Sequence, residues 1–537
     1  MTINTLQSIS GQAGLHASPF PAPRRSLRAA LAAVLGLAFG VASLPLSAAP
    51  DPRDEEIRLL REQVRQLDIR LRQLETKDAA QTAAPPAAPT PPAAPTPLAA
   101  TATAAQAAPA TAAPAAKPAA VATTAAAAPA TAGHTDAPKF TINDRGITLA
   151  SADGDSALRL RALVQADSRW FFDGPAAPAN EGFLLRRARI IFEGRFGRLF
   201  QYQIVPEYGG SSVSLIDANI NLAFAPGFQV KFGKFKAPLG LELLQADSWA
   251  FFPERSLATN LVPNRDIGVQ LGGELFGRTT EYQLAILNGV GDGRSSQNAE
   301  FDRGKDFVAR VFARPFRNRK DSFLEGLGLG IAGSVGRQEG DLGRTSGYRT
   351  DAQQTLFSYR SNVVVNNIRQ TVIQDGSTWR YTPQLSYYNG PFGMLGEYVV
   401  STVNLRAAAG QPAREITNKA WQVAAGYVVT GENSSFNGVI PRNPFNLEKG
   451  AWGALELAAR FDKLDIDNDV FPTLADPNAS AASASSWTLG ANWYLTRAFR
   501  FSLNYVQTGL KSATPNPTGG LQRKDEKAII TRAQIAF

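Results

Sequence analysis

The segment LLRRARIIFEGRF, residues 184–196, decides how the rest of this 537-residue chain is interpreted. Side chains on a β-strand alternate between two faces, so the odd and even positions of the segment form two rows. One row is mostly apolar, and the other carries Arg187, Arg189 and Arg195. Arg186 has the wrong parity, and we expect it to snorkel at an interface or to belong to the loop before the strand.

The same alternation recurs from Lys139 to Phe537, in segments of about ten residues separated by Gly, Asn, Asp and Pro. The clearest example is a hairpin near the C-terminus. Trp487, Leu489 and Trp493 share one face of its first strand, and Asn492 lies on the other. No helical period persists in this region, which indicates an all-β structure.

A soluble β-sandwich also alternates, but three features favour a membrane barrel. Aromatic residues such as Phe232, Trp487 and Tyr505 lie near the ends of apolar faces, as membrane-interface girdles do. The alternating chain end finishes on Phe537, which is typical of the strand that the barrel-assembly machinery recognises. An N-terminal export signal precedes the region. Only closed barrels can span lipid with strands, because every backbone group must be paired.

Size sets the number of strands. Residues 139–537, at roughly 25 residues per strand with its turn and loop, predict 16 strands. The fold class predicted is therefore all-β, a 16-stranded antiparallel transmembrane β-barrel with an aqueous lumen. A short coiled-coil helix and an Ala/Pro-rich linker are expected to precede it.

Residues 1–49 have the pattern of a secretory signal peptide. Arg24, Arg25 and Arg28 form the basic region, residues 29–46 are apolar, and small residues follow. A transmembrane anchor is the alternative, but the apolar run is short and rich in Ala.

Residues 50–78 predict a short coiled coil in the periplasm, and residues 79–138, almost entirely Ala, Pro and Thr, predict an extended linker. Apolar residues at alternating spacings of three and four would form the core of the coil, namely Ile57, Leu60, Val64, Leu67, Leu71 and Leu74. Fewer than three heptads leave a lone amphipathic helix as the alternative.

The composition argues against several classes of function. There is no Cys, and the two His residues, His16 and His134, lie outside the predicted barrel, so we expect no metal site and no cofactor. A barrel enzyme would need a Ser–His or Asp–His pair. The formal net charge is +9. Nucleic-acid binding is not expected, because the arginines are spread along many strands rather than clustered on one exposed face.

In a barrel, the charged row of each strand faces the pore. The cations with this parity are Arg159, Arg161, Arg169, Arg187, Arg189, Lys231 and Arg310. Rings of Arg and Lys select anions, and a guanidinium offers two parallel donors to a phosphate. Asp167, Glu193 and Asp217 are inward acids, which leave a general or weakly selective pore as the alternative.

Several segments of the chain resemble those of a known family. FLLRRARIIFEG (183–194), VSLIDANINLAFAPGFQVKFGKFKAPLGLELL (213–244) and PERSLATNLVPNRDIGVQLGG (253–273) are similar in order and spacing to the phosphate-selective porin O and P family. The resemblance covers most of residues 139–537. It implies a homotrimer of 16-stranded barrels, each with a loop folded into the pore as an anion constriction.

The resemblance also assigns roles to single residues. Arg186 or Arg187 matches the constriction arginines, Asp217 matches an acidic partner for a protonated phosphate, and Arg255 matches the arginine that closes the loop. Well-matched members carry a Ser-Lys pair in this loop, whereas this chain has Asp247 and Ser248. The nearest lysines are Lys231, Lys234 and Lys236. We expect the missing cation and the added acid to weaken anion binding, because like charges repel strongly in a constriction.

The function expected is an outer-membrane porin of a Gram-negative bacterium that passes phosphate or other small anions by passive diffusion. Its partners would be outer-membrane lipid, the barrel-assembly machinery and two further copies of the chain. A tether between outer membrane and cell wall, with an incidental pore, is the alternative that the coil and linker keep open.

Overall fold

The computed structural model describes residues 137–172, 181–298, 303–319, 322–341, 347–365, 368–515 and 525–537. The expected signal peptide, coiled coil and linker all lie outside these residues. No helix in the described part of the chain has the length and apolar character needed to cross a membrane.

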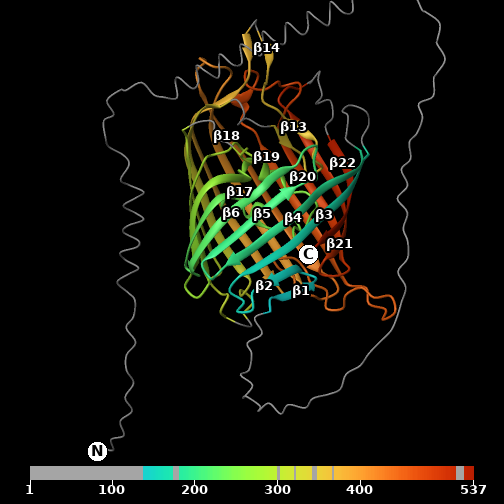
Figure 1. Cartoon of the computed structure of the whole chain (residues 1–537). Coiled ribbons are helices and arrows are strands. Elements are labelled where there is room, and N and C mark those ends of the chain that lie inside the picture. Colours follow the sequence, from blue (N-terminus) through green and yellow to red (C-terminus); the bar gives the residue numbers. More distant parts are fainter. Residues whose placement is uncertain are drawn as a thin grey trace, which may run out of the picture. The chain divides into compact units, whose positions relative to one another are not determined.

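Sixteen antiparallel strands close into a barrel, which confirms the predicted fold class (Figure 1). The first eight are β3 (Ala157–Phe171), β4 (Gly182–Phe196), β5 (Phe200–Glu207), β6 (Ser214–Ala225), β7 (Phe228–Lys236), β8 (Arg265–Leu275), β9 (Thr280–Leu287) and β10 (Asp306–Ala313). The second eight are β11 (Leu327–Asp341), β16 (Ile373–Asn389), β17 (Phe392–Arg406), β18 (Arg414–Val428), β19 (Ala454–Asp465), β20 (Ala481–Tyr494), β21 (Phe499–Ser512) and β22 (Asp525–Ala536).

The barrel closes between its last and first strands. β22 pairs with β3 from Ala528 opposite Phe171 to Ala536 opposite Leu163, and the terminal Phe537 exchanges two backbone hydrogen bonds with Ala162. Closure leaves no unpaired edge along this seam, as a strand in lipid requires.

A short hairpin extends the sheet just before the barrel begins. β1 (Lys139–Asn143) pairs with β2 (Gly146–Ala150), and β2 pairs with residues 157–160 at the start of β3. β2 therefore pairs with the part of β3 that lies beyond the end of β22. The sheet has eighteen strands, of which sixteen form the barrel.

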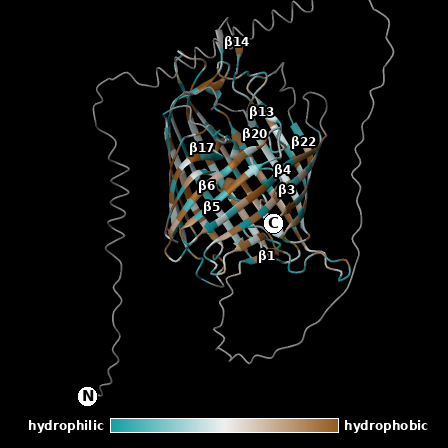
Figure 2. Cartoon of the chain, viewed as in Figure 1, coloured by the Kyte–Doolittle hydropathy of each residue, from teal (hydrophilic) through white to brown (hydrophobic). Residues whose placement is uncertain are grey.

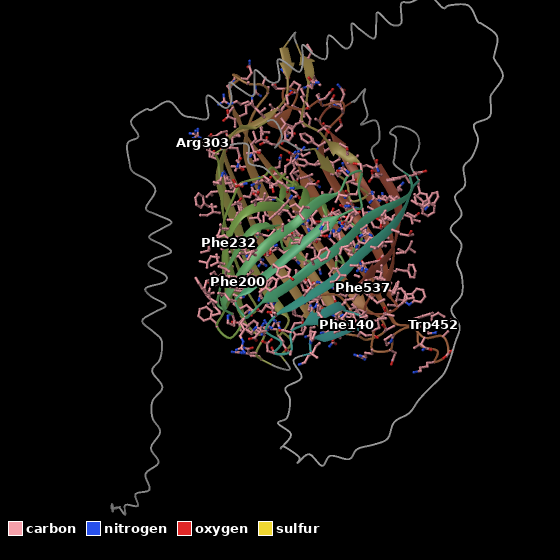
Figure 3. All side chains as sticks on the ribbon, viewed as in Figure 1. Phe140, Phe200, Phe232, Arg303, Trp452 and Phe537 are labelled. Carbon is pink, nitrogen blue, oxygen red and sulfur yellow. The ribbon has the colours of Figure 1, made fainter. Side chains whose placement is uncertain are left out.

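Apolar and polar residues alternate along the strands (Figure 2), and burial differs between the two sets. On β10, Phe307 and Val311 are about half exposed, whereas Val308 and Phe312 are buried. Figure 3 shows Phe200 and Phe232 on the outer edge of the wall, and both are substantially exposed. A continuous exposed apolar belt of this kind fits contact with lipid, not with water.

The connection between β7 and β8, residues 237–264, folds inward and packs against the opposite wall. It contains the short helix α3 (Leu241–Leu244) and the 3-10 helix η1 (Leu257–Leu261). Leu257 and Leu261 have no exposed surface and share an apolar cluster with Val399 on β17 and Ile416 on β18. The loop therefore carries a small hydrophobic core inside an otherwise polar lumen, which fixes its position.

Short elements gather at the end of the barrel away from β1 and β2 (Figure 1). They are β12 (Tyr348–Arg349), β13 (Thr355–Phe357), β14 (Val363–Val365), β15 (Ile368–Gln370) and η2 (Asn468–Val470). Tyr348, Phe357, Tyr359 and Phe471 pack as an aromatic cluster there, and burial raises the pKa of Tyr359 to about 12.

Candidate functional site

A β-bulge in β4 places two consecutive arginines on the inner face. Gln165 pairs with Arg187 and Ala166 pairs with Leu185, so Arg186 is an extra residue in the ladder. The expectation that Arg186 snorkels or precedes the strand is therefore wrong, because the bulge turns it inward, where it donates to Glu254 at 2.6 and 3.0 Å.

The bulge also reverses the parity of the residues before it. Phe183 and Leu185 are strongly exposed, whereas Leu184 pairs with the inward Asp167. The backbone of the bulge is tightly enclosed, since a Cβ on Gly209 would lie 2.7 Å from the Cα of Arg187. Only glycine fits at position 209 without shifting the arginine.

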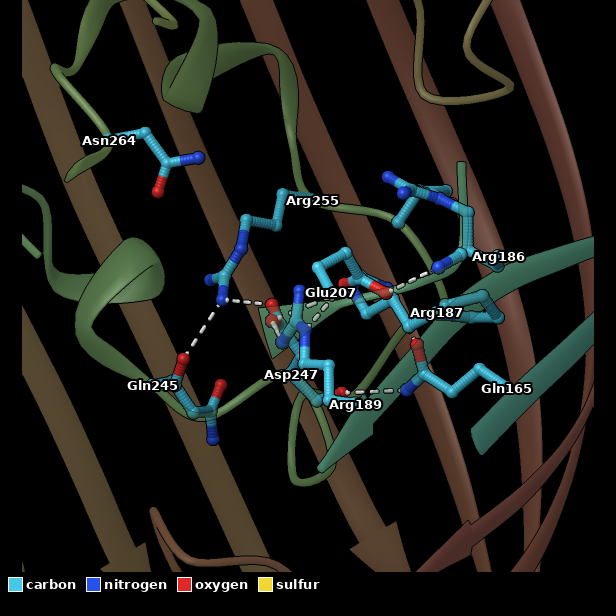
Figure 4. A network of polar contacts seen from close by, with 12 residues as sticks. Gln165, Arg186, Arg187, Arg189, Glu207, Gln245, Asp247, Arg255 and Asn264 are labelled. Carbon is cyan, nitrogen blue, oxygen red and sulfur yellow. Dashed lines mark hydrogen bonds and ion pairs between the residues drawn. The ribbon is translucent and has the colours of Figure 1, made fainter. Parts of the chain in front are cut away.

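The first centre of the site is the carboxylate of Asp247, at the inner turn of the loop (Figure 4). Arg189 Nη1 lies 2.5 Å from its Oδ2, and Arg255 Nη2 lies 2.8 Å from its Oδ1. Arg187 Nε is 3.5 Å from Oδ2. Burial alone would raise the pKa of Asp247, but these arginines hold that pKa well below its usual range.

The second centre is Glu254, from the far side of the same loop. It accepts from Arg186, from Arg169 at 2.9 Å and from Arg532 on β22 at 3.2 Å. Its side chain is almost fully buried. Burial opposes ionisation here too, yet the arginines, Arg186 foremost, lower the pKa of Glu254.

The charges around the two centres do not cancel. Six arginines gather there, namely Arg169, Arg186, Arg187, Arg189, Arg255 and Arg532. Four carboxylates face them, those of Asp167, Glu207, Asp247 and Glu254, which leaves an excess of two positive charges. Because these side chains are largely buried, such an excess attracts anions strongly.

Arg255 and Lys236 hold the first half of the loop. Arg255 donates to the carbonyls of Glu242 and Gln245, and the Lys236 amine donates to the carbonyls of Leu243 and Gln245 at 2.7 and 2.8 Å. Lys236 therefore places an amine beside the loop, which has no lysine of its own.

A cavity of about 580 Å³ opens on this cluster. Its cationic lining residues are Arg186, Arg187, Arg189, Arg255, Arg265, Arg294 and Arg349, and Asp247 and Glu254 also face it. Asp217 is not in this lining; it pairs with Arg265, whose Nε lies 3.2 Å away.

A second cavity, of about 560 Å³, lies at the other end of the arginine row of β4. Arg159, Arg195 and Lys231 line it, together with the amides of Gln201, Asn219, Asn221 and Gln229. Arg159 and Arg161 each lie 3.3 Å from Glu193, which neutralises part of that charge.

Lys234 and Arg310, two further sequence candidates, line neither cavity. Lys234 donates to Asn298 at 3.2 Å. Arg310 faces inward on β10, where it donates to Gln384 at 3.0 Å and to Gln283 at 3.3 Å.

Sequence reasoning missed Glu254, Arg265 and the inward arginines of the last strands. Arg460 on β19, Arg500 on β21 and Arg532 on β22 donate to the loop carbonyls of Glu254, Ala250 and Pro253. Inward parity could have identified these arginines, as it did on β3 and β4. Their partners could not be identified, because they lie about 200 or more positions away in the chain.

The chain is similar to several known proteins. Porin O of Pseudomonas aeruginosa is 25% identical over 446 residues, covering 75% of this chain and 94% of that protein. Among solved structures, the outer membrane channel DcaP of Acinetobacter baumannii aligns with a TM-score of 0.45 at 11% identity, over 71% of this chain and 97% of that one. An anion-selective porin from Comamonas acidovorans aligns with a TM-score of 0.43 at 12% identity, over 71% and 100%.

The family model of the phosphate-selective porins O and P matches residues 159–537. That match takes in all but the first two residues of the sixteen barrel strands, the inward loop and both carboxylate centres. One matched region therefore contains the barrel, its inward loop and the arginine row of β4, and the chain belongs to the phosphate-selective porin O and P family.

Proposed function

We propose that the protein is an outer-membrane porin that lets phosphate and related oxyanions diffuse through an arginine-lined pore. The observation that carries the proposal is the gathering of Arg186, Arg187, Arg189 and Arg255 on one cavity at the inward loop. A guanidinium stays charged at any physiological pH and presents donors in a planar fork that matches an oxyanion. A channel of this kind needs no cofactor and performs no chemistry.

The excess positive charge supports anion selectivity in particular. Ions crossing a narrow site pass within a few ångströms of its charges, where salt in bulk solution screens little. A cation would meet two uncompensated positive charges at the loop, and an anion would be attracted by them. Phosphate is the anion that the family description suggests.

The measurement that tests the proposal is the zero-current potential of the purified full chain in a planar bilayer under a KCl gradient. We expect the sign of an anion-selective channel, and a chloride conductance that falls as inorganic phosphate is added. A cation-selective potential would overturn the proposal. Anion selectivity without any effect of phosphate would leave the anion channel and reject phosphate as its ligand.

We also infer that three copies assemble and that residues 50–78 project into the periplasm. A trimeric barrel would supply the high local concentration that a coil of fewer than three heptads lacks. Deleting residues 51–138 separates the pore from a tether, because the truncated porin should conduct as before. Mass measurement of the detergent-solubilised protein tests the trimer, and a monomer in mild detergent would contradict it.

A further inference from the structure

The Asp247 carboxylate occupies the place that a permeating oxyanion would take. Its two oxygens face Arg187, Arg189 and Arg255, which line the cavity with it. Three guanidinium groups around one carboxylate provide more donors and more charge than one carboxylate can satisfy. A structural ion pair requires one partner, so this arrangement has the composition of an anion-binding site that already holds an anion.

The loop does not depend on this side chain for its position. Gln165 Nε2 donates to the backbone carbonyl of Asp247 at 3.3 Å, and Gln534 Nε2 donates to that of Ser248 at 3.1 Å. The carbonyl of Gln245 is held by two further donors. The backbone at position 247 is therefore anchored on both sides, and the carboxylate is free to leave its arginines.

Arg187 is the least satisfied of the three arginines. Its side chain is more than nine-tenths buried, and its Nε makes no hydrogen bond, with Asp247 Oδ2 3.5 Å away. A buried donor without an acceptor is costly. A tetrahedral oxyanion offers four oxygens where a carboxylate offers two, so it can reach a donor that Asp247 leaves unsatisfied.

We propose that Asp247 is a tethered competitor for the oxyanion site, whose carboxylate holds the three guanidiniums until a multiply charged oxyanion displaces it. The proposal rests on the proposed function and adds to it how tightly the pore holds its solute. A solute binds only in the fraction of time that the arginines are released, so its apparent Kd rises by the inverse of that fraction. Weaker binding shortens the time that each anion stays at the site, so the anion leaves the pore sooner.

The test is the concentration of inorganic phosphate that halves the chloride conductance of single channels in a planar bilayer. Asp247→Asn removes the charge and keeps the size, and Asp247→Ser also vacates the space. We expect the half-blocking concentration to fall by about tenfold or more in the Asn variant and further in the Ser variant, as loss of a charged hydrogen-bond competitor implies. Asp247→Glu keeps the competitor and should stay within about threefold of the wild type.

Glu193→Gln is the matched control, because it removes the same charge from an inward carboxylate that lines the second cavity. Its half-blocking concentration should change by less than about twofold. An unchanged or higher value in the Asn and Ser variants would overturn the proposal and make Asp247 a positioning residue for the arginines. Failure of both variants to form barrels would overturn it too, because the carboxylate would then be a structural clamp.

This result is separable from the proposed function. A wild-type pore that is not anion-selective at zero current rejects the function. An anion-selective wild type whose phosphate block does not respond to position 247 rejects only the tethered competitor.

Discussion

The two walls that face the inward loop use the same residue type in different ways. On the wall of β19, β21 and β22, Arg460, Arg500 and Arg532 donate to backbone carbonyls of the loop. On the wall of β4, Arg187 and Arg189 face a side-chain carboxylate and an open cavity. Inward parity alone therefore does not make an arginine part of the anion path. The first set holds the loop backbone, whereas the second set faces the cavity and is placed to meet an anion.

The largest effect should come from removing an arginine from the wall of β19, β21 and β22. Arg460 is almost fully buried and lies 2.6 Å from Asp351, 2.9 Å from Asp462 and 3.4 Å from Glu242. Arg460→Met would leave these carboxylates buried without their cation, which we expect to lower the free energy of unfolding by about 3–5 kcal/mol. Denaturation of the detergent-solubilised barrel, followed by its gel mobility without heating, measures this loss.

Arg187→Gln is the matching change on the cavity wall. Asp247 keeps Arg189 and Arg255, so we expect the free energy of unfolding to fall by about 1–2 kcal/mol, less than in Arg460→Met. The ratio of anion to cation permeability should fall by about threefold or more, since one charge is lost at the narrow site. If this variant destabilised the barrel as much as Arg460→Met, the distinction between the two walls would be wrong.

The stability that Asp247 and Glu254 give to the loop should fall only at low pH. The folded-state pKa values of Asp247 and Glu254 are depressed, so the stability that they contribute is present above their unfolded values of about 4. It is lost as the pH falls below that range towards the folded values. We expect the contribution of these two groups to the thermal midpoint to stay constant between about pH 8 and pH 5, and to decrease below about pH 4. Comparing the wild type with Asp247→Asn isolates the contribution of Asp247, since the amide variant should lose less stability on acidification.

The smallest effect is expected from Glu193→Gln in the second cavity. It frees Arg159 and Arg161, which are partly exposed to water. The anion selectivity should rise slightly at about 0.1 M salt, and the difference should vanish near 1 M, where charges are screened over about 3 Å. A change that persisted at high salt would place Glu193 in the narrowest part of the path.

The sequence predicted the barrel because strand alternation has a period of two and needs no knowledge of partners. It correctly turned Arg159, Arg187 and Arg189 inward for the same reason. It failed at Arg186, since a bulge adds one residue and reverses every assignment before it.

The partners of these arginines could not be predicted from the strands. Arg186 meets Glu254, 68 positions away, and Arg532 meets it across 278 positions. The expectation that Asp247 repels anions treated its carboxylate as an isolated charge. The structure places three guanidiniums around that carboxylate. Weaker anion binding stays a prediction, but its cause would now be that the carboxylate occupies the anion site.

The bulge of β4 has a consequence for how closely charges can be spaced along a pore. On a regular strand, two side chains on one face are about 6.6 Å apart, farther than the oxygens of one small oxyanion. At the bulge, Arg186 and Arg187 are successive residues whose Cα atoms are about 3.8 Å apart, and both reach the lumen. One strand can thus present two guanidiniums to a single ion without help from its neighbours.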